Sequence, residues 1–549
     1  GLTDPVTMGG RRRYYGLFIQ DDVKVSSRLT LNLGLRWEFQ PPAYEVADRY
    51  SSWNPGKTDP ATGMKGAYDF AGSCQVCTGK RYFGTRSWRD FGPRFGFAWR
   101  PFDKWTLRGA YGILFDADSF NGYNPTPLAK ATSTAWGGTY SLGVNPLQPW
   151  AGIFNWDNGI PASAYSPAGY NVSWGNFNRP GMIDPGYGRT PYVQQWNLNI
   201  QRELPNRIVL DVGYVGTKGT GIRVGELARI NQLPVSVLGD YGTRLGTIIG
   251  SPEAAQTARV RYPYPGFSGT VSAALREYPQ VVGNQTINVW GAPLGFSTHH
   301  ALQVSVNRKF GKGLTIYANY VWSKTMANLD SSLVGDNSGP IDYYNLALEK
   351  APATYDYPHV VKGYVNYDLP VGRGKSLLAG APRLVNALLG GWSVSAIVNY
   401  ASGAPLGFSA PSALANGWNG ALNRANVAAG DLKAAGFDKR NFELSTGLSP
   451  KNTYLNKALI SLPAPLTLGA SAPRYTQIRG FGTISEDLAV QKAWRIAERV
   501  RMQLRGELLD TFNRSKLGGP NTSVNSLNFG QVTSISGGRQ IQLGARLEF

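Results

Sequence analysis

The chain has 549 residues, of which 67 are Gly, 12% are aromatic and only 16% are charged. Few charges among many Gly and aromatic residues are typical of strands and turns rather than of helices. The formal net charge is +20, but the densest basic run is only Arg11-Arg12-Arg13, so the sequence does not indicate a nucleic-acid-binding protein. No stretch approaches the roughly 20 consecutive apolar residues of a membrane-spanning helix.

Long runs that alternate apolar with polar residues recur along the chain. The clearest is LTLNLGLRWEF at 29–39, in which every second residue is apolar. Alternation with a period of two predicts a β-strand that has one apolar and one polar face. Such runs predict thirteen strands, in chain order at 13–25, 29–39, 91–101, 105–115, 191–203, 207–216, 299–310, 314–323, 355–369, 391–401, 483–495, 498–512 and 538–549.

The connections between the predicted strands fall into two classes. Tight turns join strands pairwise, and examples are those at 26–28, 101–104, 204–207, 310–313 and 496–498. Long segments separate the resulting hairpins at 40–90, 116–190, 217–297, 324–354, 402–482 and 514–537. Loops beyond about 15 residues are uncommon in soluble domains, and the strands of a soluble β-sandwich or propeller average only about five or six residues. The pattern favours an all-β fold, a transmembrane antiparallel β-barrel with short periplasmic turns and long extracellular loops.

A membrane assigns different partners to the two faces of each strand. Hydrocarbon offers no hydrogen-bond partners, so a sheet that spans it must close into a barrel. The apolar face then meets lipid, and the polar face lines the lumen, because a charge on the lipid face costs about 2–4 kcal/mol at the midplane. We therefore expect Leu31, Leu33 and Leu35 to face outward. The charged residues expected to face the lumen include Arg36, Arg108 and Arg505.

The chain ends on IQLGARLEF, a further alternating strand whose last residue is aromatic. This ending resembles the C-terminal assembly signal of bacterial outer-membrane proteins. The resemblance implies that the barrel-assembly machinery of the outer membrane recognises the strand. The side chains of the recognised stripe would be those of Ile541, Leu543, Ala545, Leu547 and Phe549.

Several strand segments together resemble the TonB-dependent outer-membrane receptors, in particular the Oar-like subgroup. The segments are FIQDDVKVSSRLTLNLGLRWEFQPP (18–42), FGPRFGFAWRPFDKWTLRGAYGILFD (91–116), PYVQQWNLNIQRELPNRIVLDVGYVGTKG (191–219), HHALQVSVNRKF (299–310), YANYVWSKTMAN (317–328), YDYPHVVKGYVNYDLPVGRGK (355–375), RMQLRGELLDTFNRSKLGGP (501–520) and GRQIQLGARLEF (538–549). No single segment is specific, but the ordered set is. The long loops contribute very little to the resemblance.

This resemblance implies a barrel of roughly 22 strands around a plug domain, opened by energy that the TonB complex delivers. Bacterial single-chain barrels have even strand numbers, whereas thirteen is odd. We therefore expect residues 1–549 to be the C-terminal part of a transmembrane β-barrel. The plug domain, the TonB-binding region and the first strands would not be in this chain.

The implied function is that of a receptor and transporter in the bacterial cell outer membrane, for uptake of a bulky nutrient such as an oligosaccharide, a peptide or a metal chelate. The alternative is a structural or adhesive outer-membrane barrel whose loops bind partner proteins. The implied contacts are the lipid bilayer with its lipopolysaccharide, the TonB complex through the missing N-terminal part, and an extracellular ligand or surface partner protein. Neither function implies an enzymatic activity or a cofactor.

Residues suited to catalysis or metal binding are few. His299 and His300 are adjacent, but they lack an HExxH pattern or a nearby carboxylate, which favours an exposed pair at a loop edge over a metal site. Cys74 and Cys77 lack both a second ligand pair for zinc and a thioredoxin-like βαβ setting. The sequence therefore favours a disulfide between Cys74 and Cys77 in a surface loop of an oxidising compartment. No catalytic residues are predicted.

The strongest candidate for ligand contact is the long segment 116–190, which is rich in tryptophan and tyrosine. Exposed Trp and Tyr supply rigid contact area for sugars, peptides or proteins. The alternative is that these rings pack the long loops against one another. The candidate ligand-binding residues are Trp136, Trp150, Trp156 and Trp174.

Overall fold

The computed structural model describes most of the chain outside the segment that follows the fourth long strand. The residues described are 2–3, 9–116, 139–140, 157, 165–166, 170, 172–173, 180–224, 227–281, 287–309, 313–328, 339–411, 423–444, 449, 451–497 and 499–549. All structural statements below concern these residues.

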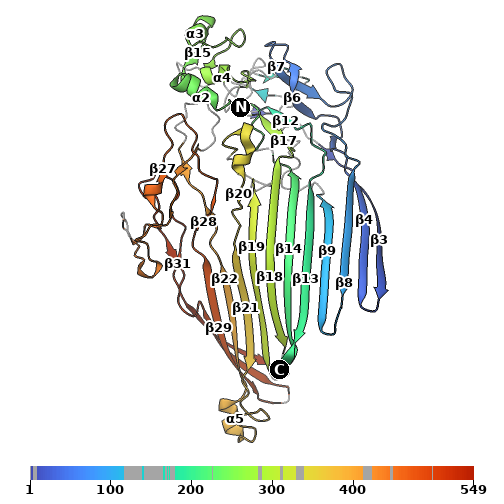
Figure 1. The fold of residues 1–549 in the computed structure, drawn as a ribbon, viewed down its shortest axis with the longest axis vertical. Helices are drawn as coiled ribbons and strands as arrows, with labels where there is room; N and C mark the ends of the chain where they lie inside the picture. Colours follow the sequence, from blue (N-terminus) through green and yellow to red (C-terminus); the bar gives the residue numbers. More distant parts are fainter. Residues whose placement is uncertain are drawn as a thin grey trace.

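Thirteen long strands form one antiparallel sheet, which we call the wall, and each strand pairs with the next along the chain (Figure 1). The strands are β3 (Tyr15–Ser26), β4 (Leu29–Phe39), β8 (Asp90–Trp99), β9 (Trp105–Phe115), β13 (Tyr192–Leu204), β14 (Ile208–Ile222), β18 (Gly295–Lys309), β19 (Leu314–Ala327), β21 (His359–Asp368), β22 (Trp392–Ala401), β29 (Thr483–Arg495), β30 (Arg501–Leu509) and β33 (Gln540–Glu548). The two-residue strand β20 (Ala351–Pro352) pairs with the end of β19. The prediction of an all-β antiparallel sheet with thirteen long strands is confirmed.

Three strands extend further toward the long loops than the alternation predicted. The prediction ended the sixth strand at 216, but β14 continues to Ile222 and stays paired with both neighbours, for instance through Lys218, opposite Gln194 and Thr298. β18 and β19 are longer in the same direction. The extension of β14, TKGTGI, is rich in Gly and Thr and carries no apolar period. A backbone ladder does not need one, because its hydrogen bonds come from the main chain.

The register separates apolar from polar side chains as predicted, since directly paired residues lie on the same face. On the apolar face, Leu33 pairs with Phe95, and Phe95 pairs with Tyr111. On the polar face, Arg108 pairs with Asn199. The polar side chains also bond to one another across strands. The hydrogen-bonded pairs include Asn32 with Asp22 at 2.5 Å and Ser395 with Asn366 at 2.7 Å.

The two outer strands of the wall, β3 and β33, each pair with one neighbour only among the described residues. Their side chains are exposed throughout. In β33, Leu543 is 83% exposed, and the following Phe549 is 97% exposed. The predicted C-terminal stripe therefore lies on an open edge of the sheet, with its leucines on the same face as Leu504 and Leu508 of β30.

The two ends of the wall differ, as Figure 1 shows, because short elements gather at the long-loop end. Those before β18 are β1 (Leu2–Thr3), β2 (Gly10–Arg11), β5 (Tyr44–Glu45), β6 (Ser51–Thr58), β7 (Lys65–Phe70), β10 (Thr139–Tyr140), β11 (Tyr165–Ser166), β12 (Gly181–Ile183), α2 (Ser236–Tyr241), η5 (Gly242–Gly246), β15 (Ile248–Ile249), α3 (Pro252–Thr257), β16 (Gly269–Thr270), α4 (Val271–Ala274) and β17 (Asn288–Trp290). Those after β19 are η6 (Tyr343–Glu349), β23 (Pro405–Leu406), β24 (Ser409–Ala410), β25 (Asn423–Arg424), β26 (Asn426–Val427), η7 (Lys439–Asn441), η8 (Lys457–Leu459), β27 (Ile460–Ser461), β28 (Tyr475–Arg479), β31 (Lys516–Leu517) and β32 (Ile535–Ser536).

The opposite end of the wall has short turns, one of which contains η3 (Pro205–Arg207). One connection there is long and carries the helix α5 (Arg383–Leu389), which lies at the same end as the C-terminus (Figure 1). The strand pattern did not predict this helix. Across the described part of the chain, no helix combines the length and the apolar character needed to cross a membrane.

Candidate ligand-binding loop assembly

The four tryptophans predicted to bind ligand, Trp136, Trp150, Trp156 and Trp174, lie outside the described residues. Their role stays a prediction. The described parts of the long segments nevertheless form a folded body, which we call the loop cap. It consists of the described residues within 40–90, 180–191, 223–294, 339–358, 402–482 and 513–537.

Three of the long segments share one hydrophobic cluster in the loop cap. Trp53 of β6 is buried and meets Tyr278 edge-on, with ring centroids 4.6 Å apart. Met182 of β12 and Val289 of β17 belong to the same cluster, and their strands pair in parallel. The described parts of segments 40–90, 116–190 and 217–297 therefore fold together rather than separately, because each supplies part of a common core.

Hydrogen bonds between the same three segments reinforce this core. The backbone N–H of Gly181 donates to the hydroxyl of Tyr68 at 3.0 Å. The N–H of Ile183 donates to Ser52 Oγ at 2.9 Å. Gln280 Nε2 donates to the carbonyl oxygen of Lys65 at 2.6 Å. Buried polar groups of this kind are costly to leave unpaired, so they fix how the segments lie against one another.

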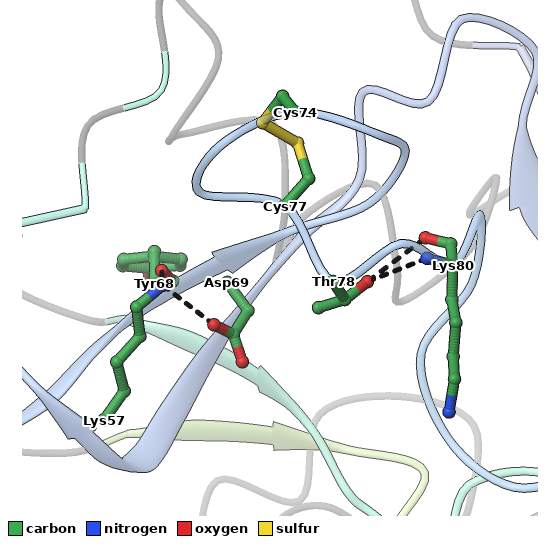
Figure 2. Close-up of a disulfide and its surroundings, with 7 residues drawn as sticks. All are labelled: Lys57, Tyr68, Asp69, Cys74, Cys77, Thr78 and Lys80. Carbon is green, nitrogen blue, oxygen red and sulfur yellow. Dashed lines mark hydrogen bonds and ion pairs between the residues drawn. A yellow bond between two sulfur atoms is a disulfide. The ribbon is translucent and has the colours of Figure 1, made fainter.

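The disulfide of Cys74 and Cys77 closes a small loop directly after β7 (Figure 2). The N–H of Thr78 returns to the carbonyl of Phe70 at 2.8 Å, which brings the end of this loop back onto the β6–β7 hairpin. Lys57 ties the hairpin itself, because its ammonium donates to Asp69 Oδ1 at 2.9 Å. Figure 2 shows the disulfide in its small loop and the Lys57–Asp69 pair beside the strands of the hairpin.

Segment 217–297 adds a lobe with its own cluster, built by α2, α3 and α4. Leu238, Leu245, Ile249 and Phe267 are buried in it. The helices start where their sequence provides caps: Ser251 Oγ accepts from Ala254 N before α3, and Thr270 Oγ1 accepts from Ala273 N before α4. Side-chain caps of this type satisfy N–H groups that the first turn leaves free.

Residues 341–356 connect this lobe to the segment 402–482. On the lobe side, Gln232 donates to the carbonyl of Ile341 at 3.1 Å and accepts from Tyr343 N at 2.7 Å. On the other side, Arg424 forms an ion pair with Glu349. Gln232 belongs to the long segment 217–297 and Arg424 to the long segment 402–482. Residues 341–356 therefore link the two halves of the loop cap.

A second arginine completes this link. The guanidinium of Arg479 pairs with Asp356 at 2.7 Å, and Asp356 is fully buried. Arg479 also donates to the carbonyl oxygens of Asp356 at 2.6 Å and of Gly403 at 3.3 Å. Asp356 in turn accepts from the N–H of Thr325, at the end of β19, at 2.6 Å. This ion pair therefore attaches the loop cap to the top of the wall.

Segments 402–482 and 514–537 form the remaining lobe around Phe408, Leu455, Ile478 and Phe529. Their backbones also bond directly. Val524 N donates to Ser409 O at 2.9 Å, and Tyr454 N donates to Gly530 O at 2.7 Å. The last two long loops thus fold as one unit.

Burial shifts the ionisation of several groups in the loop cap. Burial raises the pKa of Tyr68, so its hydroxyl stays protonated. Burial lowers the pKa of the Arg424 guanidinium, against the attraction of Glu349. For Glu45, burial acts to raise the pKa, but hydrogen bonds from the N–H groups of Arg49, Gly9 and Ala47 outweigh it and leave the pKa below 4.5. Each shift follows from structural packing and identifies no catalytic group.

The histidines do not converge on a site. His299 and His300 are successive residues inside β18, not at its loop edge, and so point to opposite faces. His299 Nδ1 lies 2.8 Å from Thr325 Oγ1, and His300 Nδ1 lies 2.8 Å from Tyr214 Oη. His359 likewise contacts Tyr320 Oη at 2.8 Å. Within the described ranges, no cluster of three or more His, Cys, Asp or Glu could hold a metal ion.

Three solved structures with a similar outline are each larger than this chain. The ferripyoverdine receptor of Pseudomonas aeruginosa bound to ferripyoverdine gives a TM-score of 0.39 at 8% identity, over 98% of this chain and 39% of that one. The ferric citrate transporter FecA in its unliganded form gives 0.39 at 10% identity, over 99% and 46%. A ferric enterobactin receptor mutant of Pseudomonas aeruginosa in complex with enterobactin gives 0.41 at 9% identity, over 98% and 45%. The chain spans less than half the length of each.

No curated protein matches the sequence. The family comparison is informative, because the outer membrane beta barrel domain matches residues 2–542, nearly the whole chain. In such a domain the apolar face of the strands meets lipid and the short turns lie in the periplasm. The chain therefore belongs to the outer membrane β-barrel domain family, and its wall is part of a bacterial outer-membrane protein.

Proposed function

We propose that the chain is the C-terminal part of a TonB-dependent receptor that takes up a bulky nutrient, such as an oligosaccharide, a peptide or a metal chelate. The ordered set of strand segments that resembles those receptors supports the family within the larger group of outer-membrane barrels. The loop cap supports a receptor rather than an open pore.

The observation that carries the proposal is the shared core of the loop cap. Trp53, Met182 and Val289 come from three different long segments and are buried together. A folded cap presents its outer surface in one arrangement, so a ligand does not have to order it on binding. A passive pore usually has shorter loops than these. The cap is therefore suited to first contact with a ligand, to which the aromatic segment 116–190 contributes.

The open edges of the wall support the second part of the proposal. A spanning sheet cannot leave a row of backbone N–H and C=O groups facing hydrocarbon. The outer strands β3 and β33 each pair on one side only among the residues described. Further strands of the same polypeptide complete the barrel between these two edges, and a plug domain of that polypeptide occupies its lumen.

Deletion of the gene in its host, with complementation by the full-length polypeptide, tests the function. Cells would be offered labelled oligosaccharides, peptides and ferric chelates, and surface binding and uptake would be measured separately. The proposal expects one class to bind and enter only in the complemented strain. Collapse of the proton-motive force should stop entry and leave surface binding intact.

Other outcomes identify other functions. Passage across the outer membrane that survives collapse of the proton-motive force would indicate a passive pore. Loss of cell adhesion, or of partner proteins that copurify with the loops, without any uptake defect would indicate the structural or adhesive barrel. Either result would overturn the transport proposal.

A further inference from the structure

The connection between β21 and β22, residues 369–391, is the longest at the short-turn end of the wall. Short turns of an outer-membrane barrel face the periplasm, so this connection lies beside the periplasmic leaflet. Its helix α5 has no buried residue. Leu384 is 80% exposed and Leu388 is 70% exposed, and they lie four residues apart on one face of the helix. The chain thus directs large apolar side chains away from the protein.

The wall holds α5 through its C-terminal carbonyl groups. Lys492 Nζ donates to the carbonyl oxygens of Leu388 at 2.7 Å and Gly390 at 2.8 Å. Trp392 Nε1 donates to Leu388 O at 3.0 Å, and Trp494 Nε1 donates to Ala387 O at 2.7 Å. These carbonyls have no partner within the helix, so the wall satisfies them. The attachment fixes where the helix lies.

The three donors place α5 on the lipid side of the wall. Trp392 pairs with Lys492, and Trp494 pairs with Met502, all in register with the apolar face. The Lys492 ammonium lies 4.7 Å from the Trp392 ring centre and 5.0 Å from that of Trp494. Tryptophans at strand ends mark the membrane interface in outer-membrane barrels. The exposed leucines therefore continue a surface that already contacts lipid.

The charge of residues 369–391 identifies the partner. The segment contains Arg373, Lys375 and Arg383, all exposed, and no Asp or Glu. A short helix with an apolar face and only basic charges is typical of elements that lie in the headgroup region of a bilayer. We propose that α5 and the adjacent Leu377 and Leu378 form an interfacial anchor that inserts into the periplasmic leaflet and binds anionic phospholipid headgroups.

Site-directed fluorescence on the full-length polypeptide tests the insertion. This chain has no free cysteine, so Leu384→Cys and Leu388→Cys each give it one thiol for an environment-sensitive dye, and free cysteines elsewhere in the polypeptide are replaced by serine. Asp103→Cys, in the β8–β9 turn where the Asp103 side chain is 90% exposed, is the matched control. Each labelled protein is reconstituted into vesicles of phosphatidylcholine and phosphatidylglycerol. Heat-modifiable migration on a gel verifies that each barrel is folded.

The anchor predicts that a nitroxide on the lipid acyl chains quenches the dyes at 384 and 388, whereas aqueous iodide does not. The control dye at 103 should show the reverse. Quenching of the α5 dyes by iodide alone would overturn the proposal. Protection of the α5 dyes from both quenchers would mean that protein covers the helix. Disulfide formation between L384C copies would mean that a second copy of the chain covers it. Either result would also overturn the proposal.

The headgroup preference has a separate test. The nitroxide is attached to phosphatidylglycerol in one sample and to phosphatidylcholine in the other. The labelled phosphatidylglycerol should quench the dye at 384 more strongly than the labelled phosphatidylcholine does. Neutralisation in the triple variant R373Q/K375Q/R383Q should abolish the difference, since each basic side chain near an anionic surface favours association roughly fivefold. Equal quenching in the unmodified segment would refute the anionic headgroup as the partner.

Discussion

Replacement of Arg479 by Ala should release the loop cap from the wall without unfolding the wall. Asp356 is 0% exposed and the Arg479 side chain 16%, so the substitution leaves a buried carboxylate without its counter-charge. It also removes donors from two backbone carbonyls. Loss of one partner of a buried ion pair costs about 3–5 kcal/mol. At about 1.4 kcal/mol per factor of ten, the linked segments should open roughly a hundredfold to a few thousandfold more often.

Hydrogen exchange followed by mass spectrometry measures this opening. Peptides that cover 351–358 and 472–482 should exchange faster in R479A, while peptides from β13 and β14 should not change. The exposed pair of Lys451 and Glu443 is the control, because an exposed ion pair is worth less than about 1 kcal/mol. K451A should therefore change the hydrogen-exchange rates by less than about fivefold.

A second variant tests the cause. In D356N/R479A no buried charge is left unpaired, so its exchange should be slower than that of R479A alone. If R479A leaves the exchange of 351–358 unchanged, or if the double variant opens more than R479A does, the assigned role of the ion pair is wrong.

Three further predictions concern the remaining loops. The lowered pKa of Glu45 means that its carboxylate stabilises the first loop above the ordinary pKa of 4.5 and that this contribution is lost as the pH falls through the folded-state value. The protection of residues 43–50, measured as exchange relative to the intrinsic amide rate at each pH, should thus decrease as the pH falls below 4.5, whereas E45Q should lack this dependence. Cys74 and Cys77 should resist alkylation until a reductant is added, and labelling of both without reduction would contradict the disulfide. Alanine at the four loop tryptophans should weaken binding of the ligand or partner while the barrel still inserts; unchanged binding would assign these rings to loop packing. The residues are Trp136, Trp150, Trp156 and Trp174.

The strands of the wall could be predicted because one rule governs their whole length. One face of a spanning strand contacts lipid, and the other face contacts water or polar side chains. Its residues therefore alternate between apolar and polar, as in 29–39. The ends of the strands are predicted less accurately than their centres. The backbone ladder between β14 and β18, for example, continues to Lys218 opposite Thr298, after the alternation has stopped. Backbone pairing there depends on the neighbouring strands, which a local pattern does not contain.

The loop cap could not be predicted because its contacts join residues far apart in the sequence. Gln280 bonds to the carbonyl of Lys65, and Arg479 to that of Asp356, and neither pair leaves a periodic signal. Helix α5 has a local signal that differs from the strand alternation: Pro382 at its start, Leu384 and Leu388 four residues apart, and Gly390 after its end. A Pro before and a Gly after an apolar run are typical helix boundaries.

The wall and the loop cap are stabilised by different interactions, which makes the experiments on each separable. Among the described residues, the four clusters of buried apolar side chains all lie in the loop cap, whereas wall residues such as Leu33 and Leu35 are exposed to the surroundings. The wall therefore depends on its backbone ladder and on lipid, and the cap on hydrophobic burial in water. Because distant substitutions without shared partners act almost additively, a defect in the cap should reach the wall only through direct ties such as Asp356 to Thr325. Loss of ligand binding in a cap variant with an intact barrel would then place the defect in the cap rather than in the wall.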